Sequence, residues 1–344
     1  MKTEINGNIR EGEVTYQRSM EHQIEDVLQN IHRNKDHNLN KRINKKVKSV
    51  IVSILRAVFI IGVSYIILQP LLQKLATSLM TEMDLFDQTV QWIPRNLTLE
   101  NYRVAWKHMN YPTAFLNTFI LTFAVSFLQL LSCTLVAYGI GRFKFKGSGI
   151  IFALVLFTLV VPPQMIMVPL SLNFRYFDLF GLLPGDGVNL LNSYWPFVLT
   201  SITAVGLRNG LFIYILRQFF RGMPKDLEEA AYLDGAGIFR TFYKIMLPGA
   251  VPGLVVIFLF AFVWQWNDYF FNTLFLSGQG NFLIQALQGV ALKALEGNHN
   301  QLVGQYASLI RHTGMILYIA PLLILYAFMQ KYFIESIQRT GIVG

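Results

Sequence analysis

Six long apolar stretches restrict most strongly what this chain can fold into. Each contains 21 to 29 residues and at most one or two charged side chains. They run from about Val50 to Leu72, Phe115 to Ile140, Ser148 to Phe174, Val188 to Leu216, Pro248 to Leu276 and Thr313 to Phe333. A helix needs about 20 mostly apolar residues to cross about 30 Å of hydrocarbon. The pattern therefore predicts an all-α membrane protein with six transmembrane helices.

The composition also favours a bilayer as the surrounding of this chain. It is 53% hydrophobic, and Asp, Glu, Lys and Arg make up only 14% of it. Soluble domains contain roughly 25% of these four residues, so a globule of this composition could not cover its own surface. These numbers exclude a disordered chain, a collagen-like fibre and an ordinary cytosolic enzyme. The single cysteine, Cys133, excludes a disulfide scaffold and a thiolate metal cluster formed by this chain alone.

The basic charge has an uneven distribution. The formal net charge is +9, which by itself would suggest nucleic acid. Twenty of the Lys and Arg residues lie in residues 1–49, in the loops after the second and fourth spans, and in the tail, whereas seven lie on the opposite side. Because cytoplasmic loops are enriched in Lys and Arg, we expect a multi-pass protein of the cell membrane with both termini in the cytoplasm. We expect the lipid bilayer, and no nucleic acid, as a partner.

The chain divides at the first span. Residues 1–49 form a polar extension without the apolar core of a cleavable signal, and residues 50–344 form the membrane domain, whose cytoplasmic loop covers 217–247. A weak helical stripe in the extension leaves two interpretations open, a solvated extension with a basic juxtamembrane cluster or a helix that docks a partner.

The loop after the fourth span has a readable local pattern. Pro224 ends the preceding helix, and Asp226 with Glu229 is typical of an N-cap and capping box. A short helix over 227–233 follows, and Gly235 or Gly237 can end it in the left-handed conformation. A second amphipathic piece, 239–246, leads to a proline at the start of the fifth span. We therefore expect a helix, a glycine turn and a second helix beside the membrane.

The same loop carries a family signature. Glu229-Ala230-Ala231, three residues, Gly235, nine residues, Ile245, one residue and Leu247 match the EAA motif in every position. This chain resembles the inner-membrane permease subunits of binding-protein-dependent ABC importers, in particular the second permease of the maltose-type, carbohydrate-uptake branch. Further segments that resemble this branch are Asn96–Tyr102, Ala137–Phe143, Pro162-Pro163-Gln164, Trp266-Asn267-Asp268 and Gln330–Phe333. The resemblance covers roughly residues 92 to 344, and the first span by its position.

The resemblance implies a six-helix permease fold and three protein partners. They are a second homologous permease subunit, a pair of ATP-binding subunits and an extracytoplasmic solute-binding protein. Two features depart from the family pattern. The 49-residue extension is longer than expected, and the end, Gly341-Ile342-Val343-Gly344, lacks a lysine before the last glycine.

The resemblance also implies that the loop couples ATP hydrolysis in another subunit to movement of the spans. A short capped helix with small residues can accept a close neighbour and act as a lever, and rotation of the attached spans would be a rigid-body transition. The alternative is that Glu229 only caps the helix and Gly235 only ends it. The predicted coupling residues are Asp226, Glu229, Ala230, Ala231, Asp234, Gly235, Ile245, Leu247 and Pro248.

Polar residues within the spans are candidates for the solute pathway. Trp264, Asn267 and Asp268 in the fifth span combine an indole, an amide and a carboxylate, which suit a hydroxyl-rich ligand. The structural alternative is that Asp268 bonds a neighbouring helix or lies at the outer interface, where Trp is enriched. For Gln129 in the second span we expect a hydrogen bond between helices.

Other classes of function remain as alternatives. A secondary transporter would require inverted repeats and ion sites at the midplane, and neither is visible in the sequence. A membrane enzyme would require a catalytic motif, but HExxH, G-x-S-x-G and the Walker pattern are all absent. The sequence therefore predicts no enzyme activity, no catalytic residue, no metal and no cofactor. The solute is most simply a sugar or oligosaccharide, with a non-sugar solute such as a peptide as the alternative.

Overall fold

The computed structural model describes residues 45–179, 181, 187–206, 208–276, 281–295 and 303–341. The described residues are mostly helical and contain no strand beyond a single bridge between Phe177 and Val188. The chain separates into two units, residues 1–72 and 73–344, which are described separately. Most of the predicted N-terminal extension, up to residue 44, and the last three residues of the chain lie outside the described residues.

The described part of the first unit belongs to one long helix, Lys45–Ser78, of which residues 73–78 belong to the second unit. Its apolar side chains lie on every face, and they are exposed along the whole stretch from Val47 to Leu72. A helix that is apolar all round belongs in hydrocarbon or against another protein. It confirms the predicted first span as a long apolar helix.

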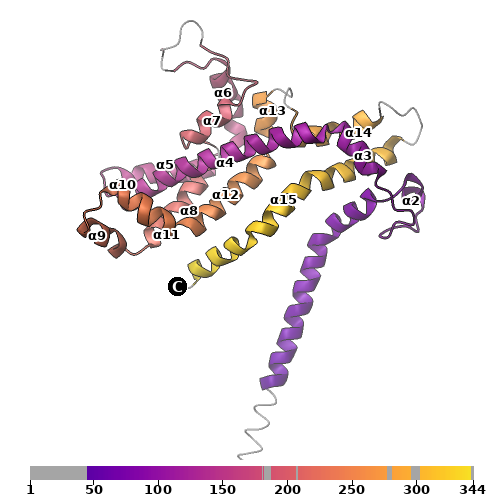
Figure 1. The fold of residues 1–344 in the computed structure, drawn as a ribbon, viewed down its shortest axis with the longest axis horizontal. Helices are drawn as coiled ribbons and strands as arrows, with labels where there is room; N and C mark the ends of the chain where they lie inside the picture. Colours follow the sequence, from indigo (N-terminus) through magenta and orange to yellow (C-terminus); the bar gives the residue numbers. More distant parts are fainter. Residues whose placement is uncertain are drawn as a thin grey trace, which may run out of the picture. The chain divides into compact units, whose positions relative to one another are not determined.

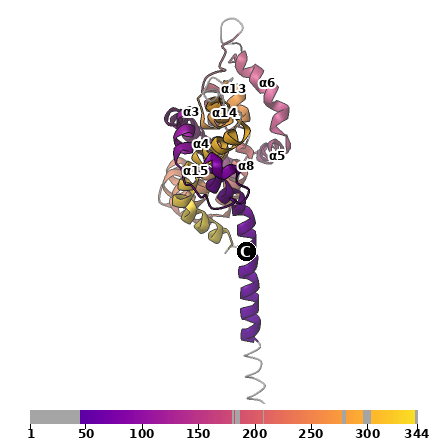
Figure 2. The ribbon, with the colours of Figure 1, turned by 90° about the vertical axis from the view of Figure 1, so that its right-hand side faces the viewer.

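The second unit is a bundle of helices around α4. Its helices are α2 (Glu82–Phe86), α3 (Glu100–His108), α4 (Tyr111–Arg142), α5 (Ser148–Val160), α6 (Pro163–Arg175), α7 (Trp195–Ile202), α8 (Asn209–Gly222), α9 (Asp226–Leu233), α10 (Ile238–Thr241), the π-helical turn η1 (Phe242–Met246), α11 (Leu247–Gly249), α12 (Val251–Trp266), α13 (Phe270–Leu276), α14 (Leu283–Leu295) and α15 (Val303–Gly341). Figure 1 shows α9, α10 and α11 at one end of this unit and α3 and α14 at the opposite end. Figure 2 shows α5 and α6 set to one side of the bundle.

The helix α4 is the axis of the packing and makes its most extensive contacts with α8 and α12. Aromatic residues recur along it every four positions, so their rings stack on one face of the helix with centroids 5.9–6.3 Å apart. Rings of α12 meet this stack edge-on, as Phe262 does against Phe119. The aromatic face of α4 therefore fixes where α12 packs against it.

The predicted spans differ in how continuous they are. Besides Lys45–Ser78, α4 and the segment Tyr306–Lys331 of α15 are long and apolar enough to cross a membrane. The third predicted span is a pair of helices bent by 107° at Val161 and Pro162, where the two prolines interrupt the helix, and the segments Ile238–Gly249 and Val251–Trp266 are bent by 75°. With each bent pair counted once, the described residues contain up to five segments that are long and apolar enough to cross a membrane. The fourth predicted span is interrupted between α7 and α8, so the total of six remains a prediction.

Candidate functional site

The loop that carries the EAA pattern folds as an elbow, which we define as residues 224–249. Its first arm is α9, and its second arm runs through α10 and η1 into α11. Gly235 has a φ of 78° and nothing within 4 Å of the position of a Cβ. The Gly235 N–H donates to the Tyr232 carbonyl and the Ala236 N–H to the Ala231 carbonyl, at 3.1 and 2.9 Å. These two bonds form a Schellman motif, so the predicted glycine turn is present at Gly235 rather than Gly237.

The predicted N-cap is wrong. Asp226 is the first residue inside α9, and Lys225 occupies the cap position without a side-chain hydrogen bond. The Lys225 carbonyl accepts from the N–H groups of Glu228 and Glu229 at 2.9 and 3.1 Å, so the helix begins one residue earlier than the capping-box pattern required. The carboxylates in this first turn still favour the helix, because they lie at the positive end of its dipole.

The EAA residues face in two directions. Ala231 is buried, whereas Glu229 and Ala230 are exposed together with Leu233 and Asp234. Residues three or four positions apart share one face of a helix, which places Asp226, Glu229 and Leu233 on the same outer side of α9. The outer face of α9 is thus an acidic and apolar strip, beside which the side chain of Ala230 leaves the backbone open to close approach.

The inner face of α9 is fixed by an ion pair that sequence analysis missed. Glu228 Oε2 lies 2.8 Å from Nε of Arg142, and the two side chains are only 14% and 5% exposed. The Tyr138 hydroxyl lies 3.1 Å from the other oxygen of Glu228. Arg142 also donates to the carbonyls of Met223 and Pro224 at 3.1 and 3.3 Å. Tyr138 and Arg142 are one turn apart at the end of α4, so this cluster attaches α9 to the central helix.

The remaining residues of the predicted coupling set build the second arm. Ile245 is half-buried in the π-helical turn and packs against the core that contains Met246, and Leu247 begins α11 beside it. Pro248 is exposed in the first turn of α11. Single π-helical turns often mark functional sites, and here the turn leads directly into the bend before α12.

Two of the three predicted pathway residues border one cavity. Trp264 and Asp268 line a polar cavity of about 290 Å³ within the bundle. Asn267 does not line it: its Nδ2 donates to the Val263 carbonyl at 2.8 Å, and its Oδ1 lies 3.0 Å from the Tyr318 hydroxyl of α15. The Asn267 side chain is therefore used in bonds within the bundle, and its role in the pathway stays a prediction. Other polar side chains at the cavity are Gln129, Thr200, Ser201, Arg208 and Gln265.

The indole of Trp264 is already packed by protein groups. The Arg208 guanidinium lies 4.9 Å from its ring centroid, and the rings of Phe212 and Phe260 stack on it at 5.6 Å. This leaves little of its faces for a ligand to stack on, so Trp264 forms part of the wall. Asp268 Oδ1 accepts the Phe271 N–H at 3.2 Å at the start of α13.

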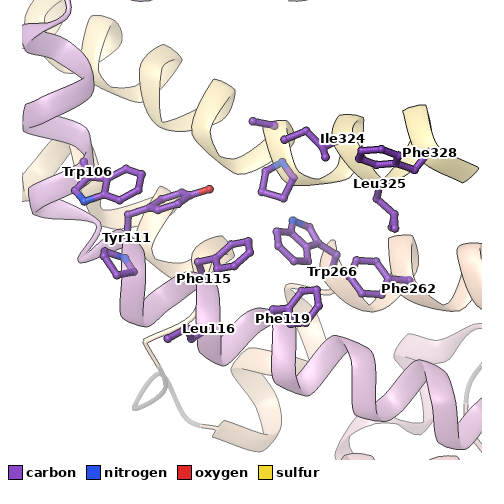
Figure 3. A pocket seen from close by; sticks show the side chains of 13 residues that line it. Trp106, Tyr111, Phe115, Leu116, Phe119, Phe262, Trp266, Ile324, Leu325 and Phe328 are labelled. Atoms are coloured by element: carbon purple, nitrogen blue, oxygen red, sulfur yellow. The ribbon is translucent and has the colours of Figure 1, made fainter.

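A larger cavity, of about 630 Å³, has a different chemistry (Figure 3). Aromatic side chains of α4 and α12 and the apolar residues of α15 around Pro321 line it almost completely. One polar atom in it, Nε1 of the fully buried Trp266, has no hydrogen-bond partner within the described residues. A hydroxyl-rich ligand would find hardly any partner there, so this groove is not the solute site.

A bundle of apolar helices with an elbow at one end, and with a partly open cavity that Arg208 and Asp268 border, fits a membrane transport component. The sequence model described as "Binding-protein-dependent transport system inner membrane component" matches residues 133–339, and the chain belongs to this family. It is a family of transport components rather than of enzymes, and its members are proteins of the inner membrane.

Individual relatives agree with the family. The chain is 29% identical to the probable ABC transporter permease protein YurM of Bacillus subtilis over 83% of this chain and 86% of the relative. It is 28% identical to the arabinooligosaccharides transport system permease protein AraQ of Halalkalibacterium halodurans, over 82% and 93%. A crystal structure of a bacterial ABC transporter that imports the acidic polysaccharide alginate has a TM-score of 0.66 at 23% identity, covering 82% of this chain and 96% of that chain. The last comparison shows that the fold is shared.

Proposed function

We propose that this chain is a permease subunit of an ATP-driven, binding-protein-dependent importer of a sugar or oligosaccharide. Relatives that align over most of this chain are named as permeases for arabinooligosaccharides, diacetylchitobiose and alpha-glucosides. The chain would work with a second homologous permease, a pair of ATP-binding subunits and an extracytoplasmic solute-binding protein. Both of its termini would lie in the cytoplasm.

The elbow is the observation that carries this proposal. The exposed side of α9 presents Glu229 and Ala230, while Glu228 and Ala231 hold the helix to the bundle from the other side. A short helix that is fixed on one side and free on the other can transmit the movement of a docked subunit as a rigid body. We assign the docking of the ATP-binding subunits to the exposed side.

The experiment is co-purification followed by uptake into whole cells. The tagged chain should bring down an ATP-binding subunit and a second permease, and cells should accumulate at least one radiolabelled sugar among maltotriose, arabinotriose and diacetylchitobiose. Glu229→Lys and Gly235→Asp should abolish uptake while the protein stays in the membrane, and Glu82→Lys on α2 should leave uptake unchanged. Normal uptake in both elbow variants would refute the coupling role.

The orientation has its own test, which uses the single cysteine. Cys133 is the single cysteine of the sequence and is fully buried. A Cys133→Ala variant therefore contains no thiol, and only an introduced cysteine can be labelled. Ala230→Cys should react with a membrane-impermeant maleimide in inside-out vesicles and not in intact spheroplasts. The reverse pattern would place the elbow outside the cell and overturn the proposal.

A further inference from the structure

Two interrupted helices meet at the polar cavity. The first interruption separates α7, which ends at Ile202, from α8, which begins at Asn209, and the second separates α12, which ends at Trp266, from α13, which begins at Phe270. Each contributes one charged side chain to the cavity, Arg208 from the first and Asp268 from the second. Inside a bilayer, non-helical backbone is tolerated only where it is buried in protein or lines a cavity, and ionisable residues mark pathways.

The backbone at the first interruption is strained. Ala204 has a φ of 57°, which is uncommon for a residue with a Cβ. The N–H groups of Val205 and Gly206 both turn back to the Thr200 carbonyl, at 3.1 and 2.9 Å. Val205 and Gly206 then line the cavity beside Arg208. Strained backbone that persists in a fold is a recurrent feature of ligand sites.

Several polar side chains at this place make no hydrogen bond within the described residues. The side-chain amide of Gln129, for which we predicted a hydrogen bond between helices, makes none and lines the cavity instead. The Arg208 guanidinium lies over Trp264 but forms no ion pair with Asp268. Asn209, the first residue of α8, lies fully buried beside Gly206 and does not line the cavity, although neither atom of its amide has a partner within the described residues. Gln129 is half-buried and Arg208 is exposed, so both side chains keep hydrogen-bonding capacity that a polar molecule in the cavity can use.

From this arrangement we infer that the subunit itself binds one neutral, hydroxyl-rich unit, such as a single saccharide ring, between Gln129, Arg208 and Asp268. This rests on the proposed import function and assigns the ligand site to this chain. Hydroxyl groups both donate and accept hydrogen bonds, so they can satisfy an amide, a guanidinium and a carboxylate together. The apolar faces of the ring would contact Phe197, Phe270 and Phe271, which also line the cavity.

Charge and size narrow the class of ligand. The cavity carries one positive and one negative side chain, so a neutral ligand leaves no charge unbalanced, whereas a uronate would place a second carboxylate beside Asp268. Ligand pockets usually have volumes of about 300–1,000 Å³. A volume of about 290 Å³ lies just below that range and suits one ring rather than a chain of rings.

The test measures direct binding to the detergent-purified complex of this chain with its partner permease and ATP-binding subunits, without the solute-binding protein. Equilibrium dialysis with radiolabelled maltotriose, arabinotriose and diacetylchitobiose would identify the neutral probe that binds. Gln129→Leu and Arg208→Met should each weaken its binding at least tenfold. Gln288→Leu, on the exposed face of α14, is the matched control and should not change it.

Asp268→Asn gives the sharpest result, because it leaves Arg208 unbalanced. Glucuronate should compete poorly in the wild type and at least tenfold better in this variant, whereas Arg208→Met should show no such gain. The site is refuted if the sugar that cells accumulate fails to bind the complex, or binds all variants equally. If one of these substitutions prevents folding, Arg208→Gln and Gln129→Ala make the same comparison. Uptake without binding would overturn this inference alone, and absence of any sugar uptake would overturn the proposed function instead.

Discussion

Glu228→Gln should detach α9 from the bundle and thereby separate ATP hydrolysis from transport. In the structure Glu228 pairs with Arg142 at 2.8 Å, and both side chains are largely shielded from water. Removing one partner of a buried ion pair costs about 3–5 kcal/mol because the other charge is left uncompensated. Arg142 keeps its bonds to the carbonyls of Met223 and Pro224, and glutamine still accepts a bond from Tyr138. We therefore expect the lower end, about 3 kcal/mol.

The neighbouring glutamate provides a matched control. Glu229→Gln makes the same chemical change one residue further on, where the side chain is exposed, so it should leave stability nearly unchanged. Tyr138→Phe removes one hydrogen bond to a charged acceptor and should cost about 1.5–3 kcal/mol. All three variants can be compared by thermal unfolding of the purified complex, together with the ratio of sugar transported to ATP hydrolysed.

A double-mutant cycle separates the ion pair from general damage to the fold. Arg142→Met combined with Glu228→Gln leaves no buried charge without its partner, so the double variant should be less destabilised than the sum of the two single variants. Strict additivity, or equal stability of the Glu228 and Glu229 variants, would refute the attachment of α9 through this pair. Restored stability without restored coupling would show that the charges also orient α9.

Three further predictions concern the backbone and pH. Gly235→Ala should cost about 1–2 kcal/mol because its φ of 78° is left-handed, whereas Gly237→Ala, at a φ of −75°, should not lower the melting temperature of the complex. Gly210→Ala would bring its Cβ to 2.9 Å from a carbonyl oxygen of α5, and such overpacking should lower the same melting temperature by the equivalent of about 1–3 kcal/mol. Hydrogen bonds from the side chain and backbone of Thr89 hold the pKa of Asp87 below its usual 3.8. This loop should therefore keep its protection from hydrogen exchange at neutral pH and lose it as pH falls through the lowered pKa, and Asp87→Asn should abolish that pH dependence.

The long helices and the elbow could be predicted because their signals are local. Apolar runs report the environment residue by residue, and the continuous helices through the first, second and sixth predicted spans follow from them. A glycine turn at Gly235 or Gly237 was predicted for a similar reason, since a residue without a Cβ is favoured wherever φ must be positive, and only the structure places the turn at Gly235. The N-cap prediction failed because either Lys225 or Asp226 could precede the first residue of α9. The backbone hydrogen bonds of α9 show that Lys225 occupies the cap position.

Glu228 and Glu229 illustrate what sequence alone could not resolve. The two acids are adjacent and chemically equivalent, but a helix separates consecutive side chains by about 100° around its axis. Only the packing of α9 against α4 decides which one meets Arg142 and which one remains exposed. One usable signal was present: Tyr138 and Arg142 are four residues apart at the end of a span, which places them on the same face.

The polar cavity could not be predicted, because the spans were detected from hydropathy averaged over long stretches of sequence. A sequence window long enough to detect a membrane helix averages over a short interruption of that helix. Arg208 was therefore predicted to lie near the end of one continuous span. In the structure it is the residue before α8. A charge at membrane depth is itself a warning that the helix around it is not ordinary, because an exposed ion there is costly. Arg208 and Asp268 are such charges, each lies at an interruption, and both interruptions open on the same cavity. Two charged residues within predicted spans, each beside an interruption of its helix, are therefore the sequence signal that best indicates the solute pathway of such a subunit.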